Sequence, residues 1–170
     1  GNIEHDDGQP AAAVDCYRQA LAILEDAGGY HEMQATVLTN FGGCLVTLGR
    51  TDEGMAMLRE AYTRARTGCF RRVAALSLTR LAEAHQLLDQ NDQAREALSE
   101  SDTLASRADD CYHDILFLNS FHRWTLARRE GNDTREKIAF GRLRHLRSLL
   151  QRRFAEVEAF DRHVERTRRG

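Results

Sequence analysis

The sequence is poor in the residues that interrupt helices. It contains a single proline, Pro10, in 170 residues. Sandwiches and barrels of short strands need many turn residues, so this scarcity argues against an all-β fold. Alanine, leucine, arginine, glutamate and glutamine dominate instead, and all favour helices. The hydrophobic share of 42% is enough to bury a core. The composition therefore predicts an all-α protein.

Other absences restrict the function. No apolar run near 18 residues and no signal peptide are visible, which predicts a cytoplasmic protein without membrane contact. The net charge of −2 gives no overall basic signal for nucleic acid. The glycine-rich phosphate-binding, dinucleotide-binding and nucleophile-elbow motifs are also missing. We therefore predict that this chain is not an enzyme and that it carries no cofactor.

The four cysteines, Cys16, Cys44, Cys69 and Cys111, form no C-x-x-C pair. Their spacing fits neither a zinc site nor a small disulfide framework, so we expect reduced and mostly buried side chains. Cys111, His113 and Asp114 are close in the sequence. Because their spacing matches no known ligand pattern, we expect a helix start there and no metal site.

A repeat of about 40 residues runs through the chain. Its anchors Gly8, Gly49, Asp89 and Gly131 are 41, 40 and 42 residues apart. Five residues after the first three anchors stands a small residue, and four further on a large apolar one (Ala13 and Tyr17, Gly54 and Leu58, Ala94 and Leu98). Apolar residues recur at helical steps before the later anchors, in 34–48, 73–88 and 115–129. The predicted unit is helix A, a tight turn and helix B.

Small residues predict how the helices of one unit pack. Gly42 and Gly54 would let the two backbones approach closely, and Ala82 and Ala94 would do the same in the next unit. No single pair can bury its own apolar face, so the pairs must stack. Three aspartates stand where the second helices should begin and are expected to accept their free N–H groups: Asp52, Asp92 and Asp133.

This pattern resembles the tetratricopeptide repeat (TPR) family. The match is best in 34–66, where Asn40-Phe41-Gly42, Gly49-Arg50 and Glu60-Ala61 fall in register with the family consensus. The resemblance implies a right-handed α-solenoid of about four helix-turn-helix repeats over residues 1–132, with the first repeat truncated. The period near 40 resembles repeats of bacterial signalling and transcription regulators. The fourth repeat departs from the pattern, because Trp124 and Glu136 replace small residues.

Residues 133–170 differ from the array. They carry 11 basic against 6 acidic residues, whereas residues 1–132 carry 13 against 20. Gly141 is the only glycine before Gly170, so we expect one long C-terminal helix of about 50 Å at about 1.5 Å per residue. Its apolar residues approximate a heptad seam: Leu143, Leu146, Leu150, Val157, Phe160 and Val164.

Two interpretations of this helix stay open. It either caps the last repeat or leaves the array as a signalling helix that pairs with a second copy in a homodimer. Residues 152–166 resemble the linkers that join TPR arrays to GGDEF diguanylate cyclase domains.

The resemblance to TPR proteins also implies a ligand-binding concave surface lined by the A helices. By register, its residues are Thr36, Thr39, Gly43 and Val46, then Leu76, Thr79, Glu83 and Gln86, then Leu118, Phe121, Thr125 and Arg128. The chaperone-binding TPR domains hold a peptide carboxylate with a clamp that includes lysine. The single lysine here, Lys137, lies outside this surface, so we expect no such clamp. The mixed apolar and polar lining would suit a protein or peptide segment.

We therefore predict a protein- or peptide-binding regulatory or sensor module of a larger bacterial signalling protein. Its output would be a C-terminal domain such as a diguanylate cyclase. The alternatives are the TPR domain of a transcriptional regulator and a passive protein-interaction scaffold.

Overall fold

The computed structural model describes residues 10–107, 110–150 and 154–169, and these confirm the predicted all-α fold. Helices and one short antiparallel hairpin follow in this order: α1 (Pro10–Ala27), α2 (His31–Thr47), α3 (Thr51–Thr67), α4 (Arg71–Leu87), α5 (Asn91–Ala105), β1 (Ser106–Arg107), β2 (Asp110–Cys111), α6 (His113–Arg129), α7 (Asp133–Leu149) and α8 (Ala155–Arg169).

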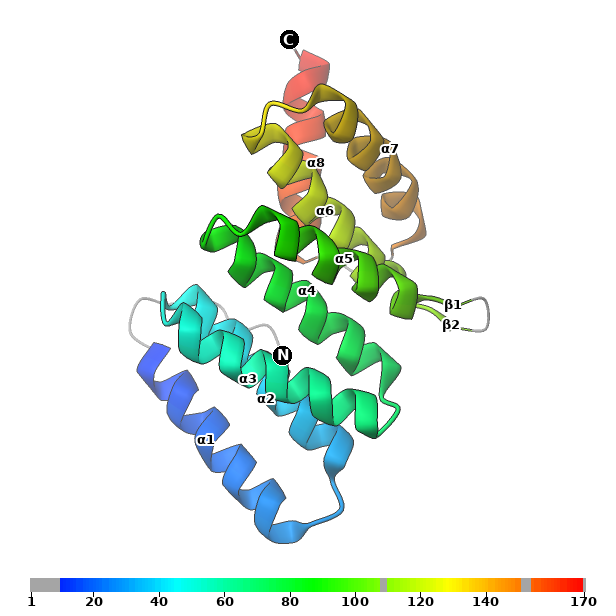
Figure 1. Ribbon diagram of the computed structural model, residues 1–170. Coiled ribbons are helices and arrows are strands. Elements are labelled where there is room, and N and C mark those ends of the chain that lie inside the picture. Colours follow the sequence, from blue (N-terminus) through cyan, green and yellow to red (C-terminus); the bar gives the residue numbers. More distant parts are fainter. Residues whose placement is uncertain (1–9, 108–109, 151–153, 170) are drawn as a thin grey trace.

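The helices form a solenoid in which neighbours in the sequence are neighbours in space (Figure 1). The pairs α2–α3, α4–α5 and α6–α7 are the predicted helix A and helix B units. Helix α1 packs on α2 as the second helix of the preceding unit. The anchor Gly8 lies outside the described residues. The hairpin was not predicted; it projects between α5 and α6, and Arg71 donates to the carbonyl of Asp110 at 2.8 Å.

The turns explain the anchors of the repeat. Gly49, Asp89 and Gly131 follow the A helices with φ of +77°, +55° and +64°. Glycine adopts this left-handed region without strain and so ends helices well. The predicted aspartate caps are wrong: among α2–α7, only α7 has a side-chain cap, in which Asn132 accepts from the N–H of Arg135 at 3.0 Å. The helices begin earlier than expected, so the aspartates lie inside the first turn.

The small residues do let the helices of a unit approach closely. A Cβ atom added to Gly42 would lie 2.6 Å from Cγ of Leu58 and 2.9 Å from the carbonyl oxygen of Gly54. A Cβ atom on Gly54 would lie 2.7 Å from the carbonyl oxygen of Gly42. Ala82 and Ala94 are fully buried in the next unit. In this unit the backbones of α2 and α3 are therefore in direct contact at Gly42 and Gly54, which explains the small residues at these positions.

Buried polar side chains join consecutive units. Thr39 on α2 shares a hydrogen bond of 2.8 Å with Ser77 on α4. Thr79 on α4 donates to Oδ1 of Asn119 on α6 at 2.7 Å, and Nδ2 of Asn119 donates to Ser101 on α5 at 2.9 Å. Each of these side chains is at most 1% exposed. A buried polar group must be paired, so these hydrogen bonds favour one register between the helices.

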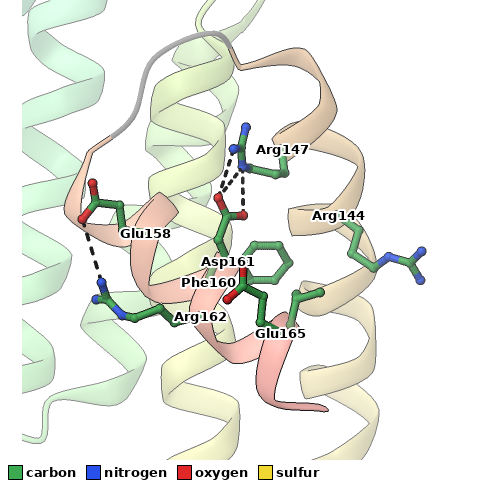
Figure 2. Close-up of a pocket in the computed structure, with 8 residues that line it drawn as sticks. Arg144, Arg147, Glu158, Phe160, Asp161, Arg162 and Glu165 are labelled. Atoms are coloured by element: carbon green, nitrogen blue, oxygen red, sulfur yellow. Dashed lines mark hydrogen bonds and ion pairs between the residues drawn. The ribbon is translucent and has the colours of Figure 1, made fainter. Parts of the chain in front are cut away.

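The single C-terminal helix predicted over 133–170 is wrong. Helix α7 ends at Leu149, and Leu150 is extended with φ −93° and ψ 124°. Helix α8 starts at Ala155 and packs back on the preceding helices (Figure 1). The side chain of Arg147 on α7 donates to both carboxylate oxygens of Asp161 on α8, at 3.0–3.2 Å, and so ties the two helices together (Figure 2). Arg152 and Arg153 of the linker-like stretch lie outside the described residues.

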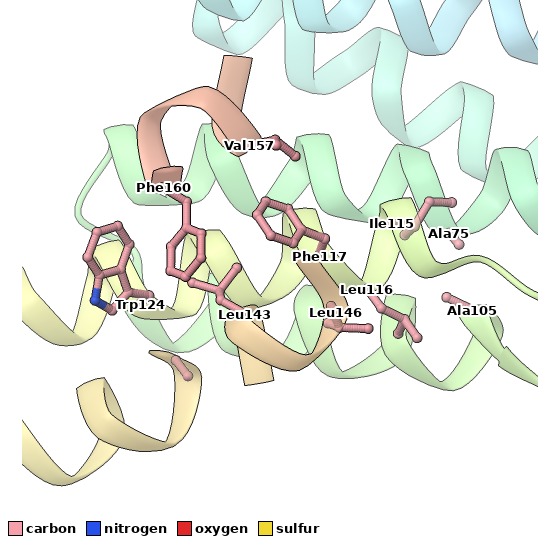
Figure 3. Packing of buried hydrophobic residues seen from close by; sticks show 11 residues of the cluster. Ala75, Ala105, Ile115, Leu116, Phe117, Trp124, Leu143, Leu146, Val157 and Phe160 are labelled. Carbon is pink, nitrogen blue, oxygen red and sulfur yellow. The ribbon is translucent and has the colours of Figure 1, made fainter. Parts of the chain in front are cut away.

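The predicted heptad seam packs inside the chain instead of facing a partner. Four of its members are 4% exposed or less and join one aromatic-rich core (Figure 3): Leu143, Leu146, Val157 and Phe160. Leu150 and Val164 are half-buried against the same core. Two short helices with apolar stripes produce nearly the same spacing as one long helix with a seam. The continuous seam for homodimer formation therefore does not form.

Trp124 explains why the last unit differs. It stands where Gly42 and Ala82 stand in the earlier A helices, yet its side chain is 4% exposed. Its ring centroid lies 6.1 Å from that of Phe160 on α8 and 6.2 Å from that of Phe140 on α7. The indole thus fills the space between α6, α7 and α8.

The cysteines are more exposed than the sequence predicted. Cys16, Cys69 and Cys111 are exposed, Cys44 is half-buried, and all four are free. Two of them occupy turns rather than helix faces: Cys69 follows α3 with φ +59°, and Cys111 belongs to the hairpin.

Candidate protein-binding surface

One side of the array is formed by the A helices α2 and α4, opposite α3 and α5 (Figure 1). We call its accessible part the inner face. Its members recur 40 residues apart on the two helices: Thr36, Asn40, Gly43 and Thr47 on α2, and Leu76, Arg80, Glu83 and Leu87 on α4. Arg80 bridges the helices, since its Cδ lies 3.5 Å from the position of a Cβ atom on Gly43.

Part of the predicted surface lies on this face. Thr36 is exposed, and Gly43, Leu76 and Glu83 are half-buried beside one another on the two helices. On α6, Thr125 is half-buried and Arg128 is exposed, with its guanidinium 5.0 Å from the ring centroid of Trp124.

The other predicted members do not line the face. Thr39, Val46, Thr79 and Gln86 are 0–7% exposed and hold the helices together. For example, Nε2 of Gln86 donates to the carbonyl of His122 at 3.1 Å. Their spacing places them on the stripe that packs against helix B and the next helix A. Leu118 is 9% exposed.

Phe121 is also not free on this surface. Its ring centroid is 5.7 Å from that of Trp124, and the side chain is half-buried against the core around α8. The sequence prediction treated α6 as another groove helix, whereas α8 covers part of it.

Sequence reasoning missed four members of the inner face: Asn40, Thr47, Arg80 and Leu87. A polar residue at the same register on consecutive A helices would have indicated that this position is accessible: Asn40 and Arg80 are 40 residues apart. Arg80 donates to Glu83 one turn later at 3.0 Å. The two side chains place charge of both signs beside apolar Leu76.

Charge pairing marks the end of the inner face where the A helices begin. Arg72 on α4 makes two hydrogen bonds to Asp114 on α6, at 3.1 and 2.5 Å. Burial acts to raise the pKa of Asp114, but the bonds and the charge of Arg72 outweigh it and leave the pKa below its ordinary value. The pair is therefore ionised at neutral pH.

The inner face becomes covered toward the C-terminal end. Asn40 is exposed, Arg80 is half-buried, and His122 at the matching position of α6 is 7% exposed. Burial holds the pKa of His122 below its ordinary value; Glu83 and Glu156 oppose this and Arg80 adds to it. Nε2 of His122 has no hydrogen-bond partner among the described residues. The accessible part of the face thus lies on α2 and α4.

His122 is expected to make the fold less stable in mild acid. Its folded-state pKa is lowered, so the unfolded chain takes up the proton first as the pH falls through about 6.5. The free energy of unfolding should fall between pH 7 and pH 5, by at most about 1.4 kcal/mol per pH unit for this one proton. Urea unfolding of the wild type and of His122→Leu across this range measures the difference.

His145, which is exposed on α7, supplies the control. The variant His145→Gln should keep the wild-type pH dependence, whereas His122→Leu should flatten it. If the free energy of unfolding changes with pH equally in the wild type and in His122→Leu, the buried imidazole is not the source of the pH dependence.

Metal binding and membrane insertion are the remaining possibilities for the described residues. No group of three or more His, Cys, Asp or Glu side chains there could hold a metal ion, which includes the surroundings of Cys111, His113 and Asp114. None of the helices described is both long and apolar enough to cross a membrane.

Comparison with known proteins gives one match. The tetratricopeptide repeat family model matches residues 1–67, which include α1, α2 and α3. None of the curated proteins and none of the solved structures matches the chain. Repeats of this family typically act as non-catalytic protein-interaction modules. The later helix pairs continue the architecture of the matched segment, so the chain is a helical repeat protein whose fold is consistent with the tetratricopeptide family that matches residues 1–67.

Proposed function

We propose that the inner face of α2 and α4 binds an extended or helical segment of a partner protein. The observation that carries this proposal is a difference in exposure in the first half of the A helices: Thr36 and Asn40 are exposed on α2, whereas the matching Leu118 and His122 are covered on α6. Small and polar side chains on α2 leave room for a backbone, and Leu76 offers an apolar contact. Arg80 and Glu83 supply a donor and an acceptor for its polar groups.

We further propose that this binding regulates a larger cytoplasmic, bacterial signalling protein whose output is a diguanylate cyclase or a DNA-binding domain. The linker-like part of the chain supports this proposal: its residues 155–166 lie on α8, which packs against α6 near the covered end of the inner face. A segment bound on α2 and α4 could then change the packing of α8. A passive scaffold would bind the same segment without such a change.

A matched pair of threonines tests the binding surface. Thr47 on the inner face and Thr63 on α3 are both exposed, and each donates its hydroxyl to the carbonyl four residues earlier. Peptides are first selected from a random library on the wild-type chain, and their affinities for Thr47→Arg and Thr63→Arg are then measured by fluorescence anisotropy. We expect Thr47→Arg to weaken binding about tenfold or more, and Thr63→Arg to leave it unchanged. Equal losses of affinity in the two variants, or a loss with Thr63→Arg alone, would refute the inner face as the binding surface.

Hydrogen exchange with the selected peptide separates a regulatory module from a passive scaffold. A transmitting module should change the protection of amides in α8 when the peptide binds to α2 and α4. Protection that changes only on α2 and α4 would favour the scaffold.

A further inference from the structure

A second groove lies on the other side of the array, between α5 and α7, with α6 as its floor. Its volume is about 360 Å³, within the range of small ligand sites. We call it the α5–α7 groove; its lining is Arg95, Ser99, Ser120, Arg123, Leu126, Ala127, Glu130, Arg135, Ile138, Ala139 and Arg142. None of these residues belongs to the inner face.

Four arginines in the groove share two carboxylates. At one end, Glu130 accepts from Arg95 at 2.5 Å and lies 3.6 Å from Arg135. At the other end, Asp102 lies 2.7 Å from both Arg123 and Arg142. The Asp102 end therefore has one more positive than negative charge, whereas the charges at the Glu130 end balance once the exposed Asp92 is counted. The only other carboxylate paired with these arginines among the described residues is Asp92, which lies 2.9 Å from Arg95 and is 99% exposed.

The two arginine pairs have a defined separation. Arg123 on α6 and Glu130, which directly follows that helix, are seven residues apart, and Arg135 and Arg142 are seven apart on α7. Seven residues of helix rise by about 10 Å. The two arginine centres thus lie about two helical turns apart along the groove.

Apolar surface lies between these two centres. Leu126, Ala127 and Ala139 are buried and form the floor, while the side chain of Ile138 is 69% exposed on the wall. An exposed isoleucine beside an apolar floor contributes to binding when a partner covers it. Arginine forks are well suited to carboxylates, which they hold with paired hydrogen bonds.

We propose that the α5–α7 groove binds an acidic helical segment of a partner protein. The segment carries two carboxylates about two turns apart, which meet Arg95 with Arg135 and Arg123 with Arg142. A large apolar side chain between the carboxylates packs on Ile138 and Leu126. This binding is separate from that on the inner face, so a variant that abolishes one leaves the other intact.

The probe is a synthetic helical peptide with glutamates seven residues apart and leucines between them. Its affinity is measured by fluorescence anisotropy for the wild type, Arg135→Gln and Ile138→Ser. Both side chains are largely exposed, so the fold tolerates their replacement. Arg144→Gln is the matched control, because Arg144 is exposed on the same helix outside the groove. A second peptide with glutamine for glutamate tests the charges.

We expect Ile138→Ser and Arg135→Gln each to weaken binding by about tenfold and Arg144→Gln to have no effect. The glutamine peptide should bind more weakly, and salt should weaken the glutamate peptide. Equal binding of the two peptides, or an equal loss with Arg144→Gln, would overturn the proposal. Amide shifts in α5 and α7 that depend on protein concentration alone would show a second copy of the chain as the occupant and would also overturn it.

Discussion

Replacing Gly42 with alanine is expected to lower the free energy of unfolding by about 1–2 kcal/mol. The added methyl would lie 2.6 Å from Cγ of Leu58 and 2.9 Å from the carbonyl oxygen of Gly54, and neither can move aside easily. Leu58 is fully buried, and the oxygen belongs to the backbone of α3. Overpacking of this kind costs about 1–3 kcal/mol, and often exceeds the roughly 1 kcal/mol that alanine gains over glycine in a helix.

The adjacent Gly43 gives the matched control. A methyl there would meet only the side chain of Arg80, at an ordinary contact distance of 3.5 Å. Gly43→Ala should therefore raise the free energy of unfolding by about 0.5–1 kcal/mol through helix propensity alone. Urea unfolding of the two variants, followed by circular dichroism, should show midpoints that move in opposite directions. Midpoints that move together would mean that close contact of α2 and α3 does not govern stability.

This pair of glycines shows why the repeat could be predicted from the sequence. Close contact between two helices leaves no room for a side chain, so small residues recur at fixed positions such as Gly42, Gly54 and Ala94. The left-handed helix end likewise leaves glycine or aspartate at a fixed period, at Gly49 and Asp89. Both constraints act on single residues, and the sequence therefore reveals them directly.

The candidate site was predicted only in part, because a repeat pattern does not state which apolar stripe faces which neighbour. Thr36 and Thr39 are both small polar residues on α2, yet one is exposed and the other is buried against Ser77. A hydrogen bond between residues 38 apart in the sequence has no local signature. His122 is likewise contacted by Gln86, which lies 36 residues earlier in the sequence.

The end of α7 could not be predicted for a related reason. Leu150 is extended without any nearby proline or glycine. The break between α7 and α8 is favoured by tertiary packing, because Val157 and Phe160 become buried against α6 and α7 only if the chain turns back. Tertiary packing thus overrides helix propensity in this segment.

Phe160→Ala is expected to release α8 from the array at a cost of about 3–5 kcal/mol, the usual range for a buried phenylalanine. The side chain is 2% exposed, and its ring centroid lies 5.3–6.1 Å from those of Phe140, Phe117 and Trp124. Removing it leaves a cavity among three helices that cannot close without moving α8. Tryptophan fluorescence should report the change at once, because Trp124, the only tryptophan, belongs to the same cluster.

Because repeats interact with their nearest neighbours, this loss should stay local. Hydrogen exchange of Phe160→Ala is expected to show faster exchange in α8 and in the adjoining parts of α6 and α7, while α2, α3 and α4 keep their protection. Leu149→Ala is the control, since that side chain is 46% exposed and should leave the pattern unchanged. A uniform loss of protection along the chain would show that α8 stabilises the whole array as one cooperative unit.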